Sequence, residues 1–235
     1  MKVKLTPRLK KITELIPKGS IVADIGTDHG YIPSYLIEKN IAKKVIASDV
    51  NKKPLENARS NIKGYGLDKH IETRQGSGLQ VLKPHEVDTV IIAGMGGLLI
   101  SQLLEDSSKI AKTIENLILQ PMQAQYDLRQ YLVNNGYTIV EDILVKEDNK
   151  IYEILKAKKG NQMVDDEIKY EIGFYIEKNP PILAEEFLNN KLKTLTEISQ
   201  QLTGKTSKTA KEKYTYCIKR IEKIQEVKEW LKKQS

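Results

Sequence analysis

The sequence predicts an α/β protein whose first 160 residues form a parallel sheet covered by helices, followed by an all-helical segment. Strand-like and helix-like segments alternate through this first part of the 235-residue chain. A glycine-rich turn over residues 26–30 separates an apolar run from a helix-like segment. The strand signal stops after residues 158–161, where two long amphipathic segments begin.

The spacing of apolar residues predicts each element in turn. Apolar residues at helical spacing predict an opening helix over residues 5–16. Short apolar runs bounded by turn residues predict parallel strands, which cover 21–25, 45–49, 71–75, 88–93 and 116–120. The segments between and after them predict helices around 34–39 and over 54–65, 98–104 and 124–134.

Two further strand-like runs close this part of the chain. Residues 137–146 and 150–158 flank a polar turn, so they predict an antiparallel hairpin. Seven strands that end in a reversed hairpin are typical of a class I methyltransferase fold with a Rossmann-like sheet. Ordinary dinucleotide-binding folds lack the reversed strand. The predicted fold is therefore α/β of the class I methyltransferase type.

The C-terminal part predicts a helical hairpin. Residues 165–202 and 207–233 carry apolar stripes of similar length and are joined by the short turn 203–207, which favours an antiparallel coiled coil. Two consecutive prolines interrupt the first stripe, so a separate short helix is expected over 167–177. The predicted domains are residues 1–160 and residues 161–235.

Composition limits the classes of protein to consider. A single cysteine, Cys217, excludes an internal disulfide and a cysteine-cluster metal site. No apolar run approaches the roughly 18 residues of a membrane span, and the N-terminus lacks the apolar core of a signal peptide, so we expect a cytoplasmic protein without membrane association. The net charge of +7 favours phosphate-rich partners such as nucleic acid, although lysine-rich surfaces are often only solvated.

Acidic residues mark the ends of the first two predicted strands. Asp24 and Asp28 belong to the glycine-rich turn, where Gly26 and Gly30 allow a ligand to approach the backbone. Asp49 ends the second strand, the position at which an acid binds ribose hydroxyls in nucleotide-binding folds. A second acid in the turn would repel a pyrophosphate and suits a cationic ligand. Helix capping is the alternative role for Asp28 and Asp49.

These residues resemble a known family. The motifs Asp24-Ile-Gly-Thr-Asp-His-Gly30, Ser48-Asp49, Ile92-Ala-Gly-Met-Gly-Gly97 and Leu119-Gln-Pro121 are similar to those of the bacterial TrmK family. Members use S-adenosyl-L-methionine to methylate N1 of adenine 22 in the tRNA D-loop. The resemblance covers the whole chain. It implies a Rossmann-like catalytic domain, a coiled-coil C-terminal domain, S-adenosyl-L-methionine as cofactor and tRNA as partner, with no metal site.

The resemblance also assigns the site residues. The cofactor contacts it implies are Asp24, Gly26, Thr27, Asp28, Gly30, Asp49, Val50, Gly76, Ser77, Gly94 and Met95. Many methyltransferases place an acid or amide after the third strand to bind the cofactor adenine. The loop here is Gln75-Gly-Ser-Gly78, so Ser77 or a backbone carbonyl must take that part.

The catalytic candidates are Asp28, His29 and Gln120. Adenine N1 carries its own lone pair, so the reaction needs alignment and tolerance of positive charge rather than a strong base. Asp28 is the first candidate to accept a hydrogen bond from the adenine N6 amine, and Gln120 is the second. A structural histidine is the alternative for His29. The substrate-contact candidates are Arg8, Tyr31, Gly96, Gly97 and Pro121. Arg8 is expected to bind the phosphates of the RNA backbone. A turn needed only for close helix packing is the alternative for the glycines of residues 94–97.

Other functions remain open at this point. The same fold could methylate another RNA, a small molecule or a protein. The chain could also be a non-catalytic interaction module, although the intact set of turn residues argues against that. The lysines of the helical hairpin either bind tRNA or are solvated. A monomer is the expected state, while a helical hairpin can also pair between chains.

Overall fold

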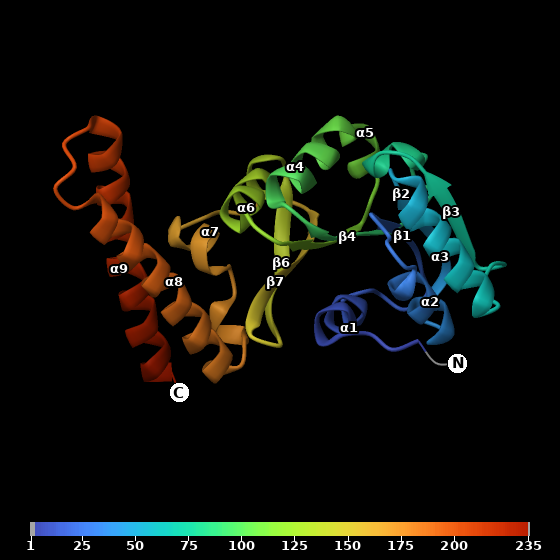
Figure 1. The fold of residues 1–235 in the computed structure, drawn as a ribbon, viewed down its shortest axis with the longest axis horizontal. Helices are drawn as coiled ribbons and strands as arrows, with labels where there is room; N and C mark the ends of the chain where they lie inside the picture. Colours follow the sequence, from blue (N-terminus) through green and yellow to red (C-terminus); the bar gives the residue numbers. More distant parts are fainter. Residues whose placement is uncertain (1–2, 235) are drawn as a thin grey trace. The chain divides into compact units, whose positions relative to one another are not determined.

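The computed structural model describes residues 3–234, which form two compact units, one ending at Met163 and the other beginning at Val164 (Figure 1). The predicted division after residue 160 and the roles assigned to its two parts stay predictions. The helices and strands of the first unit are α1 (Pro7–Glu14), β1 (Ser20–Ile25), α2 (Tyr31–Glu38), β2 (Ala42–Asp49), α3 (Lys52–Gly64), β3 (Ile71–Gln75), η1 (Gly78–Val81), β4 (Thr89–Met95), α4 (Gly97–Asp106), α5 (Ser108–Ala111), β5 (Asn116–Pro121), α6 (Gln125–Asn134), β6 (Tyr137–Glu147) and β7 (Lys150–Lys159).

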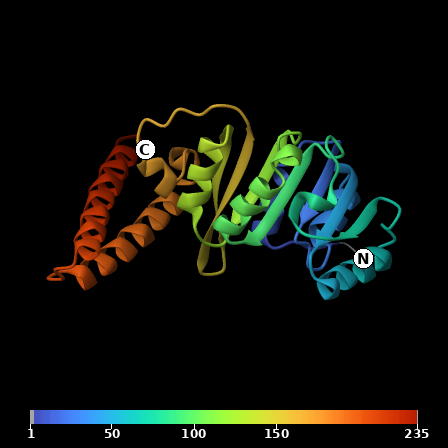
Figure 2. The same cartoon turned by 90° about the horizontal axis from the view of Figure 1, so that it is seen from above.

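The first unit is built on a seven-stranded sheet with the strand order β3-β2-β1-β4-β5-β7-β6. Strands β1 to β5 pair in parallel, whereas β7 runs antiparallel to both β5 and β6. Figure 2 shows the sheet from a second direction, with the β6–β7 hairpin in yellow. The predicted α/β class and its reversed terminal hairpin are therefore confirmed.

Helices cover both faces of the sheet. Side chains of α1, α2 and α3 share one core with residues of β1, β2 and β4, including Ile12, Leu36, Val45 and Ile91. Helices α4, α5 and α6 lie across the sheet from α1 (Figure 1). Burial from both sides explains why β5 is buried along its whole length and why its centre, residues 117–119, is a continuous apolar run.

A buried ion cluster ties α6 to the hairpin. The Arg129 guanidinium is fully buried and donates to Asp142 at 2.8 Å and to Glu153 at 2.6 Å. These contacts satisfy charges that would otherwise be strongly unfavourable in a low-dielectric interior. Residue spacing along the chain does not reveal this cluster, because its members come from three separate elements.

The second unit consists of α7 (Ile168–Ile172), η2 (Ile176–Lys178), α8 (Pro181–Leu202) and α9 (Lys208–Gln234). The prediction of one helix over 167–177 was wrong, because Gly173 adopts a φ of +95° and ends α7. Lys228, in the last third of α9, bonds Asn189, in the first half of α8. The two long helices therefore run antiparallel. The free thiol of Cys217 is buried on α9.

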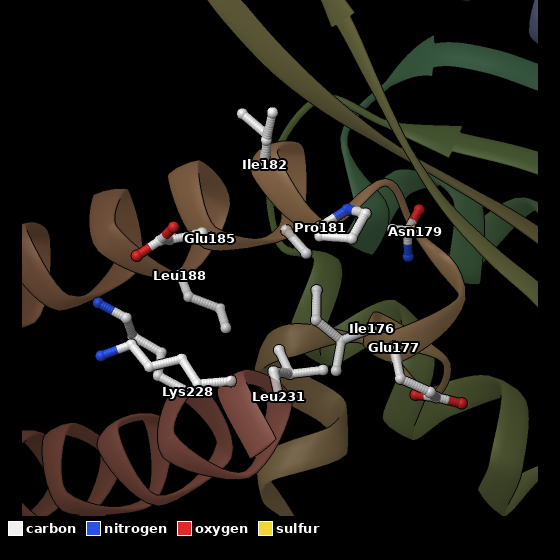
Figure 3. A pocket seen from close by; sticks show the side chains of 11 residues that line it. Ile176, Glu177, Asn179, Pro181, Ile182, Glu185, Leu188, Lys228 and Leu231 are labelled. Atoms are coloured by element: carbon white, nitrogen blue, oxygen red, sulfur yellow. The ribbon is translucent and has the colours of Figure 1, made fainter. Parts of the chain in front are cut away.

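A cavity of about 440 Å³ lies inside the second unit (Figure 3). Apolar side chains of Ile176, Leu188 and Leu231 converge on it, with Glu185 and Lys228 at its rim. The described residues that line this cavity include none of the site residues predicted from the sequence. Within residues 3–234, no helix is long and apolar enough to cross a membrane.

Candidate functional site

The turn after β1 brings a buried acid next to a glycine-rich backbone. Asp24 is buried within β1, and the N–H groups of Gly26 and Thr27 both donate to the Ser48 carbonyl at 2.8 Å. Gly26 has a φ of +83°, a conformation that L side chains rarely adopt. Gly30, with a φ of +67°, starts α2 and lies against α3. The backbone of this turn is thereby held close to the end of β2.

Asp24 is the buried acid next to this turn. Burial raises the pKa of the Asp24 carboxyl from 3.8 to about 6, a hydrogen bond with Thr27 opposes the rise, and the nearby Asp49 adds to it. In the chain from residue 3 to 234, no lysine, arginine or histidine forms a salt bridge with Asp24. A buried carboxylate without a cationic partner favours a positively charged ligand.

The ends of β2 and β3 form the neighbouring side of the site. The Asp49 carbonyl accepts from the Gly76 N–H at 3.1 Å, and the Asp49 carboxylate accepts from the Asn51 N–H at 2.6 Å. Gln75 donates to the Val50 carbonyl at 3.3 Å. Ser77 is exposed at the start of η1. These contacts bring the predicted residues of the two loops together.

The ends of β4 and β5 are joined through their backbones. The Met122 N–H donates to the Met95 carbonyl and the Gly97 N–H to the Gln123 carbonyl, both at 2.8 Å. A Cβ on Gly97 would lie 2.2 Å from the Ala124 carbonyl oxygen, so only glycine allows this approach. The turn at Gly96 and Gly97 therefore has a packing role, which was the alternative considered from the sequence.

Gly94 differs from the glycines that follow it. It has a φ of +80° and sits at a register irregularity between Ala93 and Met95. A Cβ at this position would meet no described atom within 4 Å beyond those of its two chain neighbours. The Met95 side chain reaches over Gly26, so a Cβ on Gly26 would lie 2.2 Å from the Met95 methyl carbon. The open space beside Gly94 is therefore at the end of β4, and β4 pairs with β1, the strand that precedes the glycine-rich turn.

Asp28, His29 and Tyr31 form a partly exposed group above the turn. The His29 Nε2 atom lies 3.2 Å from the Asp28 Oδ2 atom, and the His29 ring stacks on Tyr31 with centroids 5.2 Å apart. Asn61 donates to the His29 carbonyl at 3.1 Å and anchors the loop to α3. The Asp28 side chain is 67% exposed, so its carboxylate is accessible to a substrate.

Gln120 lies in a different environment from Asp28. It is fully buried, and its Oε1 atom accepts hydrogen bonds from the Arg8 guanidinium and the Gly94 N–H. Its Nε2 atom donates to the carbonyl of Pro121 at 2.9 Å, and Pro121 is itself buried. Arg8 thus reaches the strand ends, and it contacts a protein amide there.

The chemistry of these groups suits a cationic nucleoside. A buried carboxylate stands at the glycine-rich turn, a second acid ends the adjacent strand, and the loop after β3 offers a hydroxyl and backbone carbonyls. S-adenosyl-L-methionine carries an ammonium, a sulfonium and ribose hydroxyls, which match acids better than a phosphate cradle would. Within residues 3–234, no cluster of three or more histidine, cysteine, aspartate or glutamate side chains could hold a metal ion.

Comparison with known proteins gives the family. A family model described as a methyltransferase domain matches residues 5–155. The tRNA (adenine(22)-N(1))-methyltransferase of Bacillus subtilis is 37% identical over 185 residues, which cover 78% of this chain and 76% of the relative. The chain belongs to the TrmK family.

Solved structures of the TrmK family extend the similarity to both units. The crystal structure of B. subtilis TrmK, an m1A22 tRNA methyltransferase, has a TM-score of 0.86 at 32% identity and covers 97% of this chain and 100% of that one. The structure of TrmK of M. capricolum in complex with the cofactor product S-adenosyl-homocysteine has a TM-score of 0.80 at 30% identity, and the match covers 96% of this chain and 98% of that one.

The residues that surround Arg8 in this TrmK-family chain were not predicted from the sequence. Glu147 accepts from the Arg8 backbone N–H at 2.9 Å, and the Arg8 guanidinium lies 5.0 Å from the centre of the Tyr152 ring. Both residues belong to the terminal hairpin, more than a hundred positions along the chain. No local spacing could have revealed contacts over that distance.

Proposed function

We propose that this chain transfers the methyl group of S-adenosyl-L-methionine to N1 of adenine 22 in tRNA. The observation that carries the proposal is the 37% identity to the B. subtilis tRNA (adenine(22)-N(1))-methyltransferase across 78% of the chain. The fold similarity to B. subtilis TrmK supports it over nearly the whole length. The acids at the ends of β1 and β2 supply a site of matching chemistry.

In this proposal the cofactor is held by the first three strand ends. Asp24 pairs with the α-ammonium group, which relieves the burial of an unpaired carboxylate. Asp49 accepts hydrogen bonds from the ribose hydroxyls. Ser77 or a carbonyl of its loop binds the cofactor adenine. When bound, S-adenosyl-L-methionine supplies an electrophilic methyl group on a positively charged sulfur.

The target base enters over Gly94. The open space on the Cβ side of this glycine accommodates a flat ring. Asp28 accepts a hydrogen bond from the exocyclic N6 amine, which orients N1 and stabilises the positive charge that develops on the ring. His29 holds the Asp28 carboxylate at 3.2 Å, and Tyr31, stacked on His29, lies ready to contact the extruded base.

The helical unit supplies charge for the tRNA backbone. Four exposed lysines lie at the turn between the long helices and in the first turns of α9, namely Lys205, Lys208, Lys211 and Lys213. Each phosphate that such a lysine neutralises releases condensed counterions and makes binding salt-dependent. We expect a monomer that acts in the cytoplasm, where its tRNA substrate is found.

Methyl transfer to defined tRNA transcripts tests the proposal. Purified protein would be incubated with labelled S-adenosyl-L-methionine and an unmodified tRNA that has adenine at position 22, beside the same transcript with guanine there. Label in the adenine transcript alone supports the proposal. Equal labelling of both, or of neither despite measurable cofactor binding, would direct the search to another position or another substrate.

A further inference from the structure

The buried amide of Gln120 has one orientation that satisfies its neighbours. Its Oε1 atom faces two donors, the Arg8 guanidinium and the Gly94 N–H, while its Nε2 atom faces the Pro121 carbonyl. Rotating the amide by 180° would place Nε2 against two donors and Oε1 against an acceptor. Buried polar groups left unpaired in this way are strongly unfavourable, so the orientation is fixed.

Arg8 is itself held by groups from the terminal hairpin. Its backbone N–H donates to Glu147, its Nε atom lies 3.8 Å from the same carboxylate, and its guanidinium lies over Tyr152. The Arg8 side chain is only 19% exposed. A guanidinium enclosed by a carboxylate, an aromatic ring and an amide is poorly placed to bind an RNA phosphate, which is the role expected for Arg8 from the sequence.

The amide of Gln120 supports the backbone at the open end of β4. Gly94 lies where the β4–β5 register shifts, and its N–H donates at 3.2 Å to a side chain. Gly94 also has a φ of +80° and open space on its Cβ side. The position of this segment therefore depends on Gln120, and the orientation of Gln120 depends on Arg8.

We propose that Arg8 and Gln120 form a positioning pair that holds the Gly94 backbone in the shape that receives the target base. Neither residue touches the reacting atoms, and Arg8 acts through Gln120. The inference rests on the proposed function, since Gly94 is where that function places the base. It assigns helix α1 a part in the reaction, although α1 contributes no residue to the cofactor turn.

Kinetics of single and double variants test the pair. Misplacement of a substrate by about 1 Å can lower turnover by about 100-fold. Gln120→Leu and Arg8→Met should therefore each lower kcat by about 10- to 100-fold and change the KM for tRNA by less than about threefold. The double variant should be no slower than the slower single variant, because both substitutions break the same connection.

A conservative variant of Arg8 and a control on α1 separate positioning from general damage. Arg8→Lys keeps a donor for Gln120, so it should retain more kcat than Arg8→Met. Lys10→Met removes an exposed positive charge from the same helix and should leave kcat unchanged. Equal loss of kcat in Arg8→Lys and Arg8→Met would overturn the proposal.

The salt dependence of tRNA binding distinguishes a phosphate contact by Arg8 from a positioning role. If Arg8 binds an RNA phosphate, Arg8→Met should reduce the slope of log tRNA affinity against log salt concentration by about one, whereas Gln120→Leu should not. That result, together with additive losses in the double variant, would overturn the positioning role. An unchanged slope in both variants supports it.

The Gly94 amide gives a readout that does not need activity. In the nuclear magnetic resonance spectrum of the labelled full chain, the Gly94 N–H signal should shift in both Arg8→Met and Gln120→Leu and stay in place in Lys10→Met. A wild-type protein that methylates no tRNA but shows these shifts would overturn the proposed function alone. A Gly94 signal that does not move would overturn the positioning pair.

Discussion

Replacing Asp24 with asparagine should stabilise the folded chain at neutral pH and weaken cofactor binding. The pKa of Asp24 is about 6 in the folded chain and 3.8 as the ordinary value expected after unfolding. Between these pH values the folded state binds more protons, so the free energy of unfolding falls as pH rises through about 6. Each pKa unit corresponds to about 1.4 kcal/mol, so the difference between 3.8 and about 6 lowers the free energy of unfolding by about 3 kcal/mol once the pH is above 6.

Urea unfolding of both proteins at two pH values measures this difference. Asparagine has nearly the same shape as aspartate and cannot ionise. The free energy of unfolding of Asp24→Asn should therefore exceed that of wild type by less than about 1 kcal/mol at pH 4 and by about 3 kcal/mol at pH 8. Asp68→Asn, at an exposed position, is the control. Its free energy of unfolding should stay within about 0.5 kcal/mol of the wild-type value at both pH values. Lower stability of Asp24→Asn at pH 8 would refute the argument.

The same substitution should have the opposite effect on ligand binding. Loss of a charge-assisted hydrogen bond to the α-ammonium group should weaken binding of S-adenosyl-L-methionine by about 10- to 100-fold, as measured by calorimetry. A variant that is more stable but binds less well would show that Asp24 is retained for its ligand. Unchanged affinity at pH 8 would remove Asp24 from the cofactor site.

Three other substitutions probe separate parts of the first unit. Arg129→Met removes the guanidinium that pairs with two buried acids, Asp142 and Glu153, and should lower the free energy of unfolding by about 3–5 kcal/mol near pH 7, with less loss at low pH where the acids are neutral. An equal loss at all pH values in urea unfolding would contradict this. Gly97→Ala places a Cβ 2.2 Å from the Ala124 carbonyl oxygen and should lower the melting temperature by several degrees, since the clash costs about 1–3 kcal/mol; an unchanged melting temperature would count against the tight turn. Asp49→Asn should weaken cofactor binding by about 10-fold in calorimetry with little change in stability, and equal affinity would exclude the ribose contact.

The strand ends of the first unit were predictable because their residues are close in the chain. Asp24 and Asp49 each follow an apolar run, and parallel strands bring such ends to one edge of the sheet. The break after α7 was not predicted because the left-handed conformation of Gly173 depends on its surroundings. The backbone contacts between residues 95–97 and 122–124 also needed the structure, since sequence left the packing role of Gly97 as an alternative.

The role of Gln120 could not be predicted from the sequence alone. An amide after β5 is equally compatible with contacting a substrate base or supporting the protein backbone. Only the burial of Gln120 and the approach of Arg8, 112 positions earlier in the chain, distinguish these roles. Asp28, in contrast, is exposed at the same edge, so its proposed contact with the base remains compatible with the structure.

Nucleoside analysis of the reaction product tests the proposed methylation of adenine 22. An unmodified tRNA with adenine at position 22 would be treated with the enzyme and S-adenosyl-L-methionine, digested, and examined by mass spectrometry, with fragment mapping to locate the methyl group. We expect one 1-methyladenosine for each tRNA, at position 22. Methylation on N6, at another position, or only on a different class of molecule would contradict the proposed function.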